Sequence, residues 1–144
     1  ALAKARPEDE GLFQERFQAL ESDLSALDSN LEELIEGKSE TPLVGSHPVY
    51  QYLARRYGLD IVSVHFEPEE APEAEGWREL EQLLEDHPAN WMLWEGEPLG
   101  ETKAKLEELG VKSVVFDPCS NKPSEGDFLS LMKSNIAGLE QVFM

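Results

Sequence analysis

Histidine and carboxylate side chains follow each of four short apolar runs in this chain of 144 residues. Ser46 and His47 follow the first run, and the next three are followed by His65 and Glu67, by Glu95 and Glu97, and by Asp117 and Cys119. Imidazoles and carboxylates are the side chains with which proteins hold zinc or manganese. The carboxyl ends of parallel strands share one edge of a sheet, so we expect these side chains to converge on a candidate cation site.

His47 is the strongest candidate ligand in this set. It precedes Pro48, a residue suited to the first position of a helix, so the sequence predicts His47 at or beside the helix N-cap. The positive end of the helix dipole disfavours imidazolium there and favours the neutral form that binds metal. A capping residue with no ligand role is the alternative interpretation.

The other candidates carry weaker signals. Asp117 ends an apolar strand, where its carboxylate needs a partner, so ligation and simple loop capping fit equally. Glu95 also ends an apolar strand, and for it a hydrogen bond that supports another metal ligand and direct ligation fit equally. His65 fits a strand residue that alternates outward, and His87 fits a helix C-terminus without a site role. Cys119 is the only cysteine, which excludes an internal disulfide and a paired-cysteine zinc site.

A long helix is predicted from Pro7 to Glu36, with Gly37 as its stop. Its apolar residues step alternately by four and three positions and form one continuous stripe: Phe13, Phe17, Leu20, Leu24, Leu27, Leu31 and Leu34. A coiled coil is one interpretation of this stripe. We favour a helix packed against a larger body, because sustained pairing usually shows more charge complementarity beside the stripe.

The rest of the chain alternates short apolar strands with helices, which predicts an α/β fold with a four-stranded parallel sheet flanked by helices. We expect residues 1–38 to form a connecting spine helix and 39–144 to form an α/β lobe. The predicted strands lie in 41–46, 60–66, 90–96 and 111–118, and the predicted helices in 48–57, 75–87, 98–110 and 124–143.

The formal net charge of -18 argues against binding to nucleic acid or to an anionic membrane surface, both of which need basic side chains. No apolar run approaches the roughly 20 residues of a membrane span. The N-terminal residues lack the apolar core of a signal peptide, so we expect any export signal to have been removed or to lie upstream. No nucleophile elbow, Gly-rich phosphate loop or HExxH motif indicates an enzyme.

Three stretches together resemble one family. They are "GSHPVYQYLARRYGL", "LWEGEP" and "VVFDPCSNKPSEGDFLSLMKSNIAGLEQVF", and "LFQERFQALESDLSALDSNLEELI" is similar to the same family's backbone helix. The family is that of the zinc- and manganese-specific solute-binding proteins of ABC transporters, found in the periplasm or on the bacterial surface. The match covers only the second half of such a receptor, the spine helix and the C-terminal lobe, without the N-terminal lobe.

The resemblance implies capture of a divalent transition metal, zinc first and manganese as the alternative, without chemical turnover. It implies that His47 and Asp117 are metal ligands, that Glu95 is adjacent to the site, and that two further histidines come from the other lobe. It also implies delivery to a membrane permease of an ABC transporter. Cys119 departs from the small or aliphatic residue that is commoner in the family.

Two other functions fit the residues alone. One is a metal-free α/β interaction module that dimerises through the helix from Pro7 to Glu36. The other, more distant, is a metallohydrolase that uses His47, Asp117 and Glu95. Under the receptor interpretation, the spine helix packs across both lobes, so part of its apolar stripe is uncovered in this chain, which predicts self-association.

Overall fold

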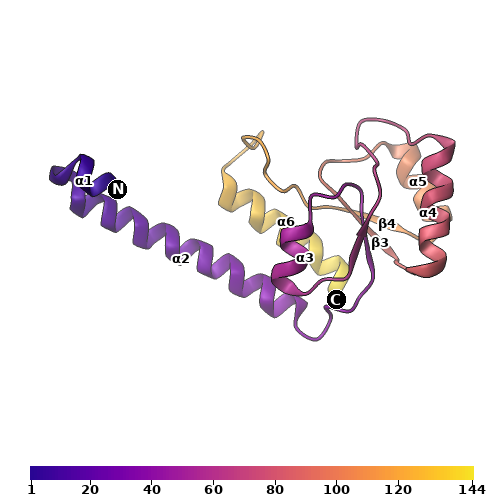
Figure 1. The fold of residues 1–144 in the computed structure, drawn as a ribbon, viewed down its shortest axis with the longest axis horizontal. Coiled ribbons are helices and arrows are strands. Elements are labelled where there is room, and N and C mark those ends of the chain that lie inside the picture. The colour runs from indigo at the N-terminus through magenta and orange to yellow at the C-terminus, as the bar shows by residue number, and fades with distance from the viewer.

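The computed structural model describes all residues, 1–144, and contains one sheet and seven helical segments (Figure 1). Every predicted strand and helix is present. The elements in chain order are α1 (Leu2–Ala5), the 3-10 turn η1 (Pro7–Asp9), α2 (Glu10–Ile35), β1 (Leu43–Gly45), α3 (Gln51–Tyr57), β2 (Ile61–Ser63), α4 (Ala74–Asp86), β3 (Trp91–Trp94), α5 (Gly100–Glu108), β4 (Lys112–Val115) and α6 (Phe128–Phe143). None of the helices is long and apolar enough to cross a membrane.

The four strands form one fully parallel sheet in the order β2-β1-β3-β4, which confirms the predicted fold class. Val44 pairs with Val62 on one side and with Met92 on the other, so β1 is central. The chain leaves β1 in one direction for β2 and returns on the other side with β3. A switch of this kind opens a crevice between the carboxyl ends of β1 and β3, where open α/β sheets bind ligands.

Both faces of the sheet are buried under helices. Alternate strand residues point to opposite sides, so Leu43 and Leu93 meet α2, α3 and α6, whereas Val44, Met92 and Trp94 meet α4 and α5. All five side chains are completely buried. The two apolar layers explain why the strands read as continuous apolar runs rather than as alternating patterns.

The spine helix α2 is only partly covered. Its C-terminal half buries Leu27, Leu31 and Ile35 against the lobe. Its N-terminal half extends away from the lobe (Figure 1), and Phe17 and Leu20 are there 56% and 51% exposed. The prediction of a long helix is confirmed, although the predicted first turn is a separate 3-10 turn at Pro7–Asp9.

Two predicted helix starts were placed too early. Helix α3 begins at Gln51, because residues 47–50 form a tight turn in which the Val49 N–H donates to the His47 carbonyl at 2.8 Å. Helix α6 begins at Phe128 after an Asp127 cap. The Asp127 carboxylate accepts the Ser130 N–H at 2.9 Å, and the Ser130 hydroxyl accepts the Asp127 N–H at 2.8 Å.

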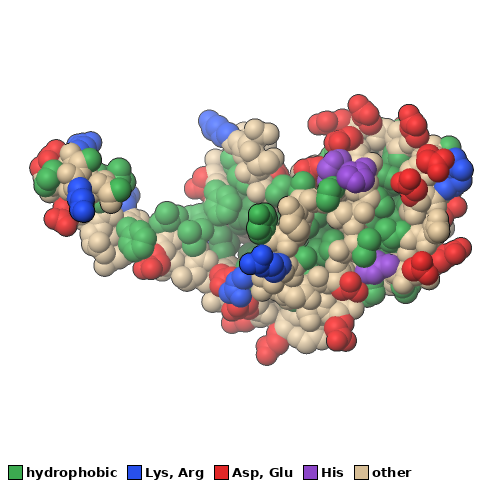
Figure 2. Space-filling view, viewed as in Figure 1, with side chains coloured by type: hydrophobic (Ala, Val, Ile, Leu, Met, Phe, Trp, Pro, Cys, Tyr) green, Lys and Arg blue, Asp and Glu red, His purple; other side chains and the backbone are tan.

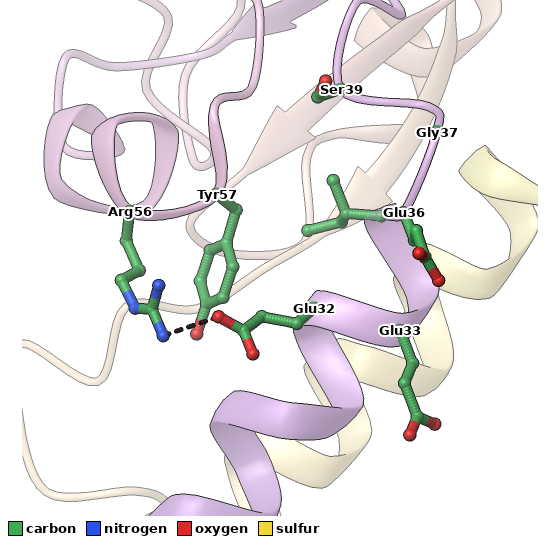
Figure 3. A pocket seen from close by; sticks show the side chains of 8 residues that line it. Glu32, Glu33, Glu36, Gly37, Ser39, Arg56 and Tyr57 are labelled. Carbon is green, nitrogen blue, oxygen red and sulfur yellow. Dashed lines mark hydrogen bonds and ion pairs between the residues drawn. The ribbon is translucent and has the colours of Figure 1, made fainter.

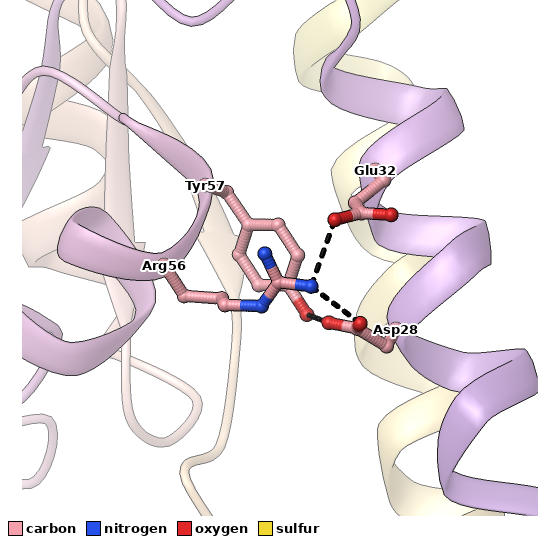
Figure 4. A network of polar contacts seen from close by, with 4 residues as sticks. All are labelled: Asp28, Glu32, Arg56 and Tyr57. Atoms are coloured by element: carbon pink, nitrogen blue, oxygen red, sulfur yellow. Dashed lines mark hydrogen bonds and ion pairs between the residues drawn. The ribbon is translucent and has the colours of Figure 1, made fainter.

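A polar clamp of four residues joins the spine helix to the lobe (Figure 4). Arg56 of α3 donates to Asp28 at 2.5 Å and to Glu32 at 2.7 Å, and the Tyr57 hydroxyl donates to Asp28 at 2.8 Å. The hydrogen bonds from Arg56 and then Tyr57 lower the pKa of Asp28. Burial, followed by the bond to Asp28, raises the pKa of Tyr57.

We expect the clamp to make folding stability depend on pH through Asp28. A carboxylate whose pKa is lowered on folding stabilises the native state above its unfolded pKa of about 3.9, and this contribution disappears as the pH falls through the folded pKa. In Asp28→Asn, the free energy of unfolding should therefore fall less steeply below about pH 4–5 than in wild type, as measured by urea titrations at each pH. Asp23→Asn, on the same helix outside the clamp, is the matched control, and an Asp28→Asn profile identical to wild type would contradict the assignment.

Candidate cation site at the carboxyl edge of the sheet

Backbone hydrogen bonds continue past the ends of the strands and fix the loops that follow them. Ser46 donates its N–H to the Leu93 carbonyl, and Phe66 donates to the Ser46 carbonyl, both at 2.8 Å. Phe116 donates to the Trp94 carbonyl at 2.8 Å. The first residues beyond all four strands therefore start from one rigid edge, as the sequence predicted.

His47 leaves this edge from the centre of the sheet. The prediction that it lies at or beside the N-cap of a helix was wrong, because Tyr50 occupies that position and α3 starts three residues later than expected. The argument from the helix dipole at an N-cap therefore does not apply to His47. Gly45, two residues before His47, allows close packing here, since a Cβ atom there would lie 2.7 Å from the Ser63 Oγ and 3.1 Å from the Tyr50 ring.

His47, Glu67 and Glu95 form a cluster in which one ligand atom from each lies within 4.8 Å of the others. The His47 Nε2 is 3.5 Å from the Glu67 Oε1, and the His47 Nδ1 is 3.9 Å from the Glu95 Oε1. The His47 and Glu95 side chains are each 25% exposed, and Glu67 is 53% exposed. The cluster is half-buried, carries two carboxylates and remains open to solvent.

His65 contributes an aromatic contact to the same cluster. Its ring meets the His47 ring edge to face, with 5.3 Å between the centroids. The space-filling view shows histidine side chains at the surface beside a group of acidic side chains (Figure 2). His65 is exposed, as predicted, and helps to fix the orientation of the His47 ring.

Asp117 lies on the same edge but is not a member of the cluster. Its strand, β4, is the second neighbour of β1, so its backbone starts two strand spacings, roughly 10 Å, from that of His47. The Asp117 Oδ1 accepts the Cys119 N–H at 2.7 Å. Its backbone N–H donates to the Asn135 Oδ1 at 3.1 Å, and its carbonyl accepts the Asn135 Nδ2 at 2.7 Å.

The pKa of the Tyr50 hydroxyl is affected by the carboxylates that follow β3 and β4, Glu95 and Asp117. Its hydroxyl is buried and donates to the Phe116 carbonyl at 3.1 Å. Burial raises the pKa of this hydroxyl, and the charges of Glu95 and Asp117 raise it further. The two carboxylates therefore share one electrostatic environment beside the first turn of α3.

Two other features, the third histidine and a hollow beside the polar clamp, lie away from the candidate site. His87 caps the C-terminus of α4, as predicted, and its Nε2 is 3.0 Å from the Leu43 carbonyl at the start of β1. A hollow of about 440 Å³ lies between α2 and α3, lined in part by Glu32, Glu36 and Arg56 (Figure 3). Neither feature is at the carboxyl edge of the sheet.

The sequence did not single out two residues that define this edge. Glu67 was noted beyond the second strand but was not chosen as a site residue, because nothing in a proline-punctuated acidic loop marks one glutamate above the others. Asn135 is a buried polar residue in α6, only 3% exposed. The only signal for it was an amide on the otherwise apolar face of the final helix.

Comparison with known proteins places the chain in a family. The family model described as the periplasmic zinc-uptake complex component A, ZnuA, matches residues 1–142. The zinc-binding lipoprotein AdcA of Streptococcus pneumoniae is 26% identical over 150 residues, which cover 98% of this chain and 30% of that protein. The chain thus spans less than a third of this curated relative.

Solved structures share the fold. The Zn(II)-bound ZnuA-like domain of Streptococcus pneumoniae AdcA superposes with a TM-score of 0.85 at 23% identity, covering 99% of this chain and 56% of that one. The metal-dependent lipoprotein YcdH of Bacillus subtilis gives a TM-score of 0.85 at 20% identity, covering 99% and 57%. Because the family model matches nearly the whole of this chain, the chain belongs to the ZnuA family of periplasmic zinc-uptake components.

Proposed function

We propose that this chain forms the C-terminal lobe and spine helix of a receptor that captures zinc outside the cytoplasm for an ABC transporter. The chain matches the zinc-uptake family over residues 1–142 and covers just over half of the related solved domains. Residues 1–38 act as the spine and 39–144 as the lobe. The second lobe and the membrane permease are the partners that this function requires.

The observation that carries the proposal is the position of His47. It leaves the sheet at the switch between β1 and β3, with Glu67 and Glu95 on either side of its imidazole. A half-buried imidazole between two carboxylates at a ligand-binding edge provides the donors that a divalent transition metal needs. The net charge of -18 favours the approach of a cation.

We assign His47 and Asp117 as metal ligands and place Glu95 beside them. The bond from the Cys119 N–H occupies only the Oδ1 of Asp117, so the Oδ2 is available to a metal ion. Asn135 holds the Asp117 backbone at both its N–H and its carbonyl. The remaining ligands come from the other lobe, and closure of the two lobes completes the cage.

The chemistry of this site is binding without turnover. An imidazole-containing site favours zinc, whereas additional oxygen ligands would favour manganese. The family is one of zinc-uptake components, and the curated relative AdcA is a zinc-binding lipoprotein. Zinc is therefore the cargo, and the residues of this lobe bind it, release it and perform no reaction on it.

In the receptor that contains both lobes, we expect His47→Ala to raise the zinc Kd by at least about 100-fold and Asp117→Asn by at least about 10-fold. Each variant removes one ligand from a site of about four, which affects a closed tetrahedral site strongly. Competition calorimetry with a chelator of known affinity measures both effects.

Asp60→Asn is the matched control, because Asp60 precedes β2 at the opposite edge of the sheet. Its zinc Kd should stay within about twofold of wild type. Unchanged zinc affinity in both His47→Ala and Asp117→Asn would refute the proposed function.

A second candidate function rests on the exposed half of the spine helix. Phe17, Leu20 and Leu24 are 56%, 51% and 42% exposed, and Figure 2 shows apolar side chains along this segment. An uncovered apolar stripe favours association of the chain with itself. In the metal-free interaction module, this association would be the function, whereas in the receptor the other lobe would cover part of the stripe.

Sedimentation velocity tests the contribution of the stripe. We expect the 144-residue chain to associate as its concentration rises, and Leu20→Glu to shift it toward monomer. Ser22→Glu adds the same charge on the opposite side of the helix and should associate like wild type. A wild-type chain that stays monomeric at all concentrations would remove this candidate.

A further inference from the structure

We infer that Glu67 is a third protein ligand for the cation, so that this lobe alone holds the ion through His47 and Glu67, with Glu95 orienting the imidazole. The inference rests on the proposed function and extends its ligand set. It assigns different roles to two glutamates that both contact the same histidine. It also implies that the ion can bind to this lobe before the lobes close.

The separation of the two donor atoms fits a shared ion. Zinc binds histidine nitrogen and carboxylate oxygen at about 2.0–2.1 Å, so two ligands at a tetrahedral angle lie about 3.3 Å apart. The His47 Nε2 and the Glu67 Oε1 are 3.5 Å apart. One ion can therefore bridge them without movement of either backbone.

Glu95 is one of the three residues of the cluster, but its recorded contact with His47 is to the other nitrogen of the ring, Nδ1. The His47 Nδ1 is shielded from solvent and has no hydrogen-bond partner, and the Glu95 Oε1 is 3.9 Å from it. Metal-binding histidines usually donate their second N–H to a carboxylate or carbonyl, which fixes the tautomer. With the proton on Nδ1 facing Glu95, the free lone pair is on Nε2, the nitrogen that lies 3.5 Å from Glu67.

The backbone around Glu67 is fixed, although its side chain is half exposed. Phe66 is buried, and its N–H donates to the Ser46 carbonyl directly before His47. On the other side of Glu67, the buried Pro68 accepts the Leu99 N–H at 3.2 Å and packs beside Gly96. Glu67 is thus held between the loops that carry His47 and Glu95, whereas Glu69 is free of such contacts.

The lobe therefore provides two ligands and leaves the remaining coordination positions to water. Such a site binds zinc less tightly than a closed cage with four protein ligands. Asp117 lies farther along the edge and is not needed for this first binding step. It would join when the two lobes close around the ion.

Calorimetric titration of the 144-residue chain with Zn²⁺ tests the inference directly. We expect one ion per chain, with a Kd that rises at least about 10-fold in Glu67→Gln, because one of two protein ligands is lost. Glu69→Gln removes the same charge from the same loop and should change the Kd by less than about twofold.

The outcomes separate this inference from the proposed function. Zinc binding that is lost in His47→Ala but equal in Glu67→Gln and Glu69→Gln would leave the function standing and overturn the ligand role of Glu67, which would then only form an ion pair with His47. Absence of zinc binding by the wild-type chain would overturn the inference, while the receptor with both lobes tests the function itself. Equal losses in Glu67→Gln and Glu69→Gln would show a general charge effect and also overturn it.

Discussion

The parallel pairing of β1 with β3 is the constraint on which the candidate site depends. The pairing forces the chain to leave β1 and β3 at the same edge, which brings the His47 and Glu95 side chains together from positions 48 residues apart. The hydrogen bond from the Ser46 N–H to the Leu93 carbonyl extends the pairing to the residue before His47. The position of the imidazole is therefore set by the sheet and not by the short helix that follows it.

The surrounding structure supports this edge from three directions. Asn135 of α6 holds the Asp117 backbone, the Tyr50 hydroxyl of the α3 cap donates to the β4 end, and the clamp of Arg56 and Tyr57 joins α3 to the spine. The clamp residues are largely exposed, so their contribution is one of geometry more than of stability. A shift of the spine relative to the lobe would have to act on α3, which begins four residues after His47. In the proposed receptor, this arrangement would connect the spine helix with the candidate cation site.

The sequence predicted the parallel sheet, the long helix and the edge at which side chains converge, because these follow from apolar patterning and from the chirality of the polypeptide. It placed His47 and Glu95 correctly at that edge. The predicted start of α3 was wrong because Pro48 fits a tight turn as well as a first helical turn. Only the tertiary contacts of Tyr50 decide between these two conformations. The strand order was not readable from the sequence, so the proximity of Glu67 to His47 and the greater distance of Asp117 were not either. Strand order depends on how the helices pack on the two faces, which residue types alone do not specify.

X-ray absorption at the zinc edge of the zinc-loaded chain tests the central claim, a cation bound at His47, most directly. We expect a shell of nitrogen and oxygen atoms at about 2.0–2.1 Å, with multiple scattering from one imidazole and no sulfur. Sulfur scattering at about 2.3 Å would place the ion on Cys119, the only cysteine. A spectrum without imidazole scattering would show that His47 is not a ligand. Either of these spectra would contradict the account.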